Sequence, residues 1–355
     1  MTTASPPATP LPARGAAASA SSAAAPAPAS IPAATAAAPA GLLDHALHPR
    51  WTVPVLLLLA ALPPLAAAAG EDFYIGLATR ILVFALAATS LNLILGFGGM
   101  VSFGHAAFVG TGAYAVGILM QQGVASAWIA WPAAVLASAL FALAVGAVSL
   151  RTRGVYFIMI TLAFAQMLFY LMVSVKAWGG EDGLALPGRS AVGGGFDLAS
   201  DTRFYYVVLA LFVLAFLGIQ RLLNARFGHA LQAIRENETR MGAIGFPVYR
   251  YQLAAFTLAG GLAGLAGALL ANQSGFVSPS LLQWNQSGLL LVMVILGGVG
   301  HPWGGFIGAV AFLLLEEVLS AYTIHWQFIL GAVLLLVVLA APRGLAGLLR
   351  REKKA

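Results

Sequence analysis

Apolar runs of about 20 residues recur along most of this chain, and the charged residues stand between these runs rather than within them. A helix that crosses a lipid bilayer needs roughly 20 consecutive, mostly apolar residues. Charged residues make up 8% of the 355-residue chain, whereas about 25% is typical of soluble proteins. The sequence therefore predicts an all-α polytopic integral membrane protein. It excludes an ordinary soluble enzyme, a nucleic-acid-binding protein and a disordered regulator.

The candidate membrane spans can be placed with this length requirement. Three of them are short or interrupted by glycine and could be re-entrant rather than spanning, namely 103–120, 286–300 and 304–322. We therefore expect eight to ten transmembrane helices. The ten candidates are 52–69, 76–96, 103–120, 128–150, 155–175, 204–223, 251–272, 286–300, 304–322 and 326–341.

The positions of the basic residues predict the orientation, because Lys and Arg gather in the short cytoplasmic loops of membrane proteins. We take the ten segments to alternate in direction and the side of the C-terminus to be the inside. The outer loops then contain only Lys176, Arg189 and Arg203 of the 18 basic residues, and Arg80 lies within a span. All other Lys and Arg residues are inside. Both termini are therefore expected to be cytoplasmic.

The ends of the chain and two long loops divide it further. Residues 1–41 are almost entirely Ala, Pro, Ser and Thr, which predicts a disordered tail. The alternative, a cleaved signal peptide, would need a basic start and a Leu-rich centre that this stretch lacks. Residues 42–349 form the predicted transmembrane domain, and 350–355 a basic cytoplasmic tail. The outer loop at 176–203 and the inner loop at 224–250 are too long to be simple connections.

The inner loop contains a periodic apolar pattern. Leu231, Ile234, Met241 and Ile244 are spaced so that they would line one face of a short helix. Gly245 stands where a helix C-terminus is often capped, and the proline at 247 prevents its continuation.

Several kinds of catalytic site are excluded by missing residues. A phosphate-binding P-loop needs a Gly-Lys pair, and none of the three lysines follows a glycine. The chain has no cysteine, and its six histidines are scattered, which argues against a zinc site. The sequence therefore predicts a protein that is not an enzyme and that binds no cofactor or metal itself.

Polar residues inside the apolar segments are candidates for a transport path. Each of them could simply form a hydrogen bond to a neighbouring helix, but together they fit the broken-helix path of a transporter. The candidates are Asn92, Ser102, His105, Thr161, Gln166, Glu316 and Glu317.

The two carboxylates and the glycines have their own alternatives. Placing a carboxylate inside the membrane costs free energy. Glu316 and Glu317 therefore either line the transport path, or lie near the outer mouth, where they are hydrated or paired with Arg80 or His325. Small residues at four-residue spacing allow close helix packing in lipid. For these residues we favour packing over a direct transport role: Gly260, Gly264, Gly267, Gly304 and Gly308.

A series of motifs gives the chain a family resemblance. Taken in order along 75–349, they closely resemble those of the branched-chain amino acid permeases of ATP-binding-cassette transporters. The internal GVYF, TLAFAQ and RENE pieces look like the LivM-type subunit rather than its LivH-type partner. The motifs are SLNLILGFGGMVSFGHAAFVGTGAYAVGIL (90–119), RGVYFIMITLAFAQ (153–166), GGEDGL (179–184), FGHALQAIRENETRMGAIG (227–245), GALLANQSGFVSPS (267–280), VMVILGGVGHPWGGFIGA (292–309) and APRGLAGLL (341–349).

The resemblance implies a role in import across a bacterial-type cytoplasmic membrane. The chain would be one of two non-identical permeases that take Leu, Ile or Val from an extracytoplasmic binding protein, and two separate ATPase subunits would bind the ATP. The loop at 224–250 matches the family's cytoplasmic coupling segment. Its apolar face would seat in the ATPase while its charged flank fixes the register. The expected ATPase-coupling residues are Leu231, Ile234, Arg235, Glu236, Asn237, Glu238 and Gly245.

Other functions remain as alternatives. A permease of the same family could carry urea, short-chain amides or other amino acids. A secondary transporter could use its carboxylates as proton sites, and an intramembrane enzyme would need Glu316, Glu317 and His325 to converge on a polar cavity. In the outer loop, Trp178 and an acidic rim are expected to engage the binding protein; the rim is Glu181, Asp182, Asp197 and Asp201.

Overall fold

A computed structural model describes residues 49–70, 73–193, 198–341 and 344–349, and these residues belong to one compact unit. The predicted tail at 1–41, the basic end at 350–355 and Asp197 lie outside the described residues. The regular secondary structure of the described part is helical apart from two short antiparallel strands, β1 (Leu184–Ala185) and β2 (Phe276–Val277), and one isolated bridge.

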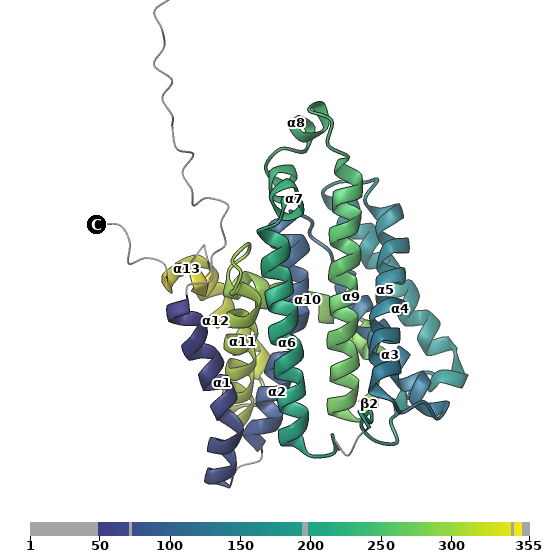
Figure 1. Ribbon diagram of the computed structural model, residues 1–355, viewed down its shortest axis with the longest axis vertical. Coiled ribbons are helices and arrows are strands. Elements are labelled where there is room, and N and C mark those ends of the chain that lie inside the picture. Colours follow the sequence, from purple (N-terminus) through teal and green to yellow (C-terminus); the bar gives the residue numbers. More distant parts are fainter. Residues whose placement is uncertain (1–48, 71–72, 194–197, 342–343, 350–355) are drawn as a thin grey trace, which may run out of the picture. The chain divides into compact units, whose positions relative to one another are not determined.

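Most of the long helices run side by side (Figure 1). Their bounds follow the apolar segments of the sequence closely. Within the described residues, six helical segments are long and apolar enough to cross a membrane, namely those of α2, α4, α5, α6, α9 and α11. The expectation of a polytopic helical protein is thereby confirmed. The helices that match the ten predicted segments are α1 (Pro49–Ala69), α2 (Phe73–Asn92), α3 (His105–Gln121), α4 (Ala127–Ser149), α5 (Val155–Ser174), α6 (Asp201–Leu223), α9 (Val248–Ser274), α10 (Trp284–Gly297), α11 (Gly304–Tyr322) and α12 (Trp326–Ala340).

Shorter elements join these helices. The π-helical turn η1 (Leu93–Phe97) continues α2, and η2 (Lys176–Trp178) and η3 (Pro279–Leu282) are single 3₁₀ turns. In Figure 1, α7 (Arg226–Glu236) and α8 (Glu238–Ala243) lie between α6 and α9, at the end opposite β2. The helix α13 (Leu345–Leu349) follows α12.

Two helices form the centre of the packing. The helix α9 packs against α2, α3 and α4, and α2 packs against α6, α10 and α11. Most of α2 is buried, whereas α5 and α12 expose apolar side chains along their length. Exposed apolar side chains on the outermost helices fit contact with lipid tails.

The small residues allow close approach of the helices, as the sequence indicated. A Cβ atom at Gly264 would overlap Ser138 of α4, and one at Gly267 would overlap the Val109 carbonyl of α3. On α11, a Cβ atom at Gly308 would overlap the Met293 carbonyl of α10. These glycines are therefore packing positions between helix backbones.

Two of the predicted short spans are indeed short. At 1.5 Å per residue, α3 (17 residues) and α10 (14 residues) extend about 26 and 21 Å. A spanning helix needs about 17 to 25 residues, so α3 is at the lower limit and α10 is below it. By contrast, α11 is among the helices long enough to cross, which disfavours the re-entrant alternative for 304–322.

Candidate functional site

Two polar clusters lie at opposite ends of α2. We call the first the helix-break junction, which consists of Asn92, Gly96, Arg235, Gly300 and His301. We call the second the charged cavity, which is lined by Phe73, Gly76, Leu77, Arg80, Asp201, Gln273 and Glu317. Of the predicted path residues, Asn92 belongs to the first cluster and Glu317 to the second, and Glu316 pairs with Arg80 of the second. Ser102 and His105 lie between α2 and the first turn of α3, and Thr161 and Gln166 lie on α5.

In the helix-break junction, Asn92 joins the end of α2 to the loop between α10 and α11. Its side chain is buried. The Nδ2 atom donates to the His301 carbonyl oxygen at 2.8 Å, and the Gly300 N–H donates to Oδ1 at 3.0 Å. Because both halves of the amide are used, a shift of the loop would leave buried polar groups unpaired.

Arg235 connects the same junction to α7. Its Nη1 atom donates to the Gly96 carbonyl oxygen, in the turn that continues α2. The side chain also lies so close to Gly99 and Gly300 that a side chain at either glycine would contact it. Arg235 therefore links α7 to the turn that continues α2 and to the loop between α10 and α11.

Side-chain hydroxyls accept hydrogen bonds from backbone N–H groups at the start of α3. The Ser102 Oγ atom accepts from the Gly104 N–H at 3.2 Å, and the Ser287 Oγ atom accepts from the Ala106 N–H at 2.9 Å. His105 is buried, with Nε2 2.8 Å from Ser90 Oγ. The free N–H groups of a helix start need such partners when they are buried. Ser102 and His105 thus stabilise the break after α2.

The two polar candidates on α5, Thr161 and Gln166, differ in their hydrogen bonds. The Thr161 hydroxyl donates to the Ile158 carbonyl at 2.9 Å, and a Cβ atom at Gly104 would overlap the Thr161 carbonyl. Gln166 lies farther along α5, and its buried Oε1 atom has no hydrogen-bond partner among the described residues.

The prediction of one helix with a single apolar face at 224–250 is wrong. Asn237 divides the segment into α7 and α8, with an extended backbone and an Oδ1 atom that accepts from the Arg240 N–H at 2.8 Å. Asparagine favours such helix starts because its side chain replaces a missing backbone acceptor. As a result Ile244, at 65% exposed, leaves the face formed by the earlier residues.

The expected ATPase seat on Leu231 and Ile234 is also wrong. These side chains are 0% and 2% exposed, and they pack within this chain. They therefore hold α7 against the long helices and offer no surface to another subunit. Gly245 has the expected left-handed backbone, with a φ of +89°.

The exposed part of the segment includes several of the residues that the sequence predicted, together with Phe246. Glu236 and Asn237 are exposed, and Glu238 forms an ion pair of 2.9 Å with Arg153. Ile244 and Phe246 present 65% and 38% of their surface to solvent. The sequence analysis missed Arg153 and Phe246, although an aromatic residue between Gly245 and Pro247 in a polar loop was a usable signal.

The charged cavity has a volume of about 450 Å³ and lies where α2 and α6 begin and α9 and α11 end. Arg80 Nη2 lies 3.2 Å from Glu316 Oε1, which is one of the pairings that the sequence allowed. Glu317 instead lines the cavity. The two adjacent carboxylates therefore have different surroundings.

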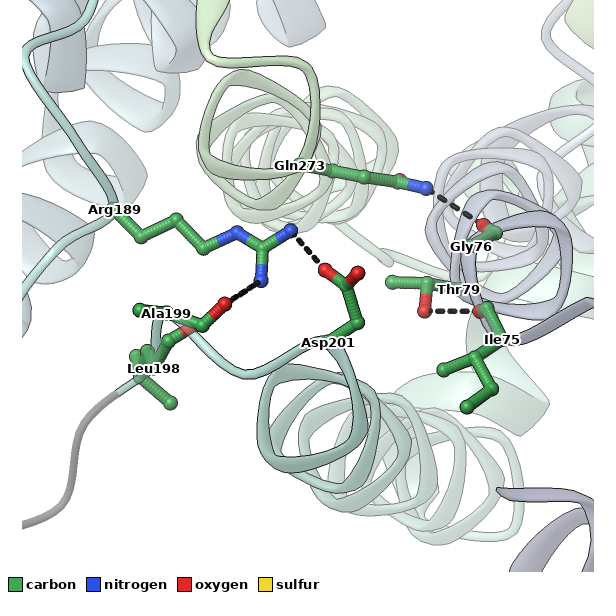
Figure 2. Close-up of polar contacts among 8 residues, drawn as sticks. All are labelled: Ile75, Gly76, Thr79, Arg189, Leu198, Ala199, Asp201 and Gln273. Carbon is green, nitrogen blue, oxygen red and sulfur yellow. Dashed lines mark hydrogen bonds and ion pairs between the residues drawn. The ribbon is translucent and has the colours of Figure 1, made fainter. Parts of the chain in front are cut away.

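Figure 2 shows the polar contacts beside this cavity. Gln273 extends from α9 and donates from Nε2 to the Gly76 carbonyl oxygen of α2 at 2.8 Å. Asp201, at the start of α6, faces Arg189, whose guanidinium also donates to the carbonyls of Leu198 and Ala199. The sequence analysis missed Gln273 because a single amide near a helix end carries no periodic signal.

The geometry offers little to the enzymatic alternative. The His325 backbone N–H donates to Thr323 Oγ1, while Glu316 pairs with Arg80. The described residues include no group of three or more His, Asp or Glu side chains that could hold a metal ion.

Comparison with known proteins gives a consistent picture. Residues 73–338 match the family described as branched-chain amino acid transport system / permease component. The chain is 29% identical to the high-affinity branched-chain amino acid transport system permease protein LivM of Salmonella typhimurium, over 84% of this chain and 75% of that protein. The LivM protein of Methanocaldococcus jannaschii is 23% identical over 70% of this chain and 82% of that protein.

A second type of relative also matches. The high-affinity branched-chain amino acid transport system permease protein LivH of Escherichia coli K12 is 26% identical, over 76% of this chain and 93% of that protein. No solved structure matches the chain.

Proposed function

Since the chain belongs to the family of permease components of the branched-chain amino acid transport system, we propose that it carries leucine, isoleucine or valine across the cytoplasmic membrane. The observation that carries the proposal is the family match, which covers 73–338 and thus nearly all of the long helices. The chain is a multi-pass membrane protein, and its relatives are named as transport permeases.

The partners follow from the same premise. A LivH-type permease completes the pore, two ATPase subunits bind the ATP, and an extracytoplasmic binding protein delivers the amino acid. The helices α7 and α8 face the cytoplasm, because the basic residues of the 224–250 loop favour that side. The charged cavity then faces the outside.

Reconstitution tests this function directly. The full chain is placed in proteoliposomes with a LivH-type permease, the ATPase subunits and the binding protein, and uptake of labelled amino acids is measured. We expect uptake of leucine, isoleucine and valine that requires ATP inside. Preference for urea or a short-chain amide would instead favour the alternative within the family. Uptake driven by an ion gradient without ATP would contradict the proposal.

A topology measurement checks the orientation. The chain has no native cysteine, and Thr239 and Lys176 are both exposed, near opposite ends of the bundle. We expect a membrane-impermeant maleimide to label Lys176→Cys in intact cells and to label Thr239→Cys only after permeabilisation. The reverse pattern would show that the assigned orientation is wrong.

The exposed apolar residues after α8 supply an ATPase docking surface. Replacing Ile244 with aspartate should weaken association with the ATPase by about 1 kcal/mol or more. The reason is that apolar side chains that become buried when the subunits associate contribute most of the binding energy of such interfaces. Co-purification and stimulated ATP hydrolysis measure this loss. Ile324→Asp is the matched control, since Ile324 is 94% exposed near the other end of the bundle. Equal behaviour of the two variants would place the docking surface elsewhere.

A further inference from the structure

We propose that the charged cavity is an entry site for a free amino acid in its zwitterionic form, with an aliphatic side chain. The assignment of the cavity to the outer face rests on the proposed function, whereas the ligand chemistry rests on the residues that line it. Those residues include one cation, Arg80, two side chains with acceptors that lack partners in the described structure, Gln273 and Glu317, and two apolar side chains.

The size and the apolar wall fit such a ligand. A volume of about 450 Å³ is within the usual range of small-molecule pockets, roughly 300–1,000 Å³. Phe73 is 58% exposed, and Leu77 is partly buried beside it. These two side chains offer the cavity an apolar surface on which a branched aliphatic group can pack.

Arg80 provides the partner for a carboxylate. It is anchored by one ion pair of 3.2 Å to Glu316 and lies 5.8 Å from the centre of the Phe84 ring. A guanidinium has five N–H donors in a fixed plane, and 41% of the Arg80 side chain is exposed. The cation is therefore positioned by its neighbours and keeps donors for a ligand.

Gln273 and Glu317 provide the partners for an ammonium group. The Gln273 Nε2 atom is bound to the Gly76 carbonyl, which fixes the amide orientation, while Oε1 is buried without a partner in the described structure. The Glu317 carboxylate forms no ion pair with any described residue. An ammonium group has three donors, and it would satisfy both acceptors. Buried polar groups without partners are rare in folded proteins.

The balance of charge discriminates between ligand types. Glu316 offsets Arg80, and Arg189 offsets Asp201, so Glu317 leaves the cavity with an excess negative charge. A zwitterion uses both signs, and an amine lacking the carboxylate still meets Glu317. An acid lacking the ammonium is repelled. We therefore expect binding to weaken in the order L-leucine, 3-methylbutylamine, 4-methylpentanoate.

Binding of these three probes tests the site. The full chain is reconstituted with its LivH-type partner in lipid nanodiscs without binding protein, and affinities are measured by titration calorimetry. Glu317→Gln and Gln273→Leu should each weaken leucine binding, by about tenfold for the charged contact. Glu317→Gln should weaken the amine equally and leave the acid unchanged or improved, which a merely structural role would not produce. Gln220→Leu is the matched control, because Gln220 also has a buried, unpartnered Oε1 but lies near the other end of α6.

Several outcomes would overturn the site. These are no leucine binding to the wild type, equal binding by wild type and both variants, or equal loss of amine and acid in Glu317→Gln. If one variant fails to fold, the other variant and the order of the three probe affinities in the wild type still test the site. If leucine is taken up with ATP but does not bind to the permease pair, the proposed entry site is wrong and the proposed function still holds. If leucine binds to the permease pair but is not taken up with ATP, the proposed function is wrong and the proposed entry site still holds.

Discussion

Replacing Gly308 with alanine is expected to destabilise the folded chain by about 3 kcal/mol, the upper end of the usual cost of overpacking. The added Cβ atom would overlap the backbone carbonyl of Met293 and approach the backbone of Gly297. A side chain could rotate away from such a contact, but backbone within a helix cannot. The helices α10 and α11 would have to separate, which would disturb the adjoining helix-break junction.

The matched control for this prediction is Gly288→Ala, also at the α10 part of the fold. A Cβ atom at Gly288 meets no atom within 4 Å, so alanine should be neutral or slightly favourable in the helix. Thermal unfolding of the purified chain in detergent measures both effects. Equal unfolding temperatures for Gly308→Ala and the wild type would show that α10 and α11 do not pack as closely as described.

Replacing Arg235 with glutamine is expected to reduce ATP-driven uptake by about 5- to 150-fold, the range of typical coupling free energies. The Arg235 guanidinium reaches the Gly96 carbonyl at the end of α2, while its backbone belongs to α7. Glutamine is shorter and carries no charge, so this contact would be lost. The buried Leu231 and Ile234 would still hold α7 in place, so the unfolding temperature should change little.

Two further variants separate coupling from charge. Arg235→Lys keeps the cation and most of the length, and it should recover part of the uptake. Arg240→Gln removes an exposed cation from α8 and should leave uptake nearly unchanged. Full uptake by Arg235→Gln, with normal ATP hydrolysis, would show that the junction does not transmit motion between α7 and the long helices.

The helix α2 connects the two polar clusters. Arg80 at the charged cavity and Asn92 at the helix-break junction are separated by about 18 Å along its axis. Since α2 is largely buried and packs against α6, α9, α10 and α11, a displacement at one end must be accommodated by its neighbours. This provides a physical connection between the proposed entry site and the helix-break junction, which Arg235 joins to α7.

The positions of the long helices could be predicted from the sequence alone. The predicted segment 304–322 has the same bounds as α11, and 155–175 differs from α5 by one residue. Hydropathy succeeds here because a spanning helix must satisfy all its backbone groups internally and must expose apolar side chains to lipid. Those requirements act on each segment separately, so no knowledge of its neighbours is needed.

The partners of individual side chains were decided only by the tertiary structure. The spacing of Leu231 and Ile234 correctly indicated an apolar face, but periodicity does not say whether that face meets this chain or another subunit. Likewise Glu316 and Glu317 are adjacent and chemically identical, yet only Glu316 is paired with Arg80. Neighbouring helix residues point about 100° apart, so the packing of α2 against α11 determines which carboxylate is neutralised and which one faces the cavity.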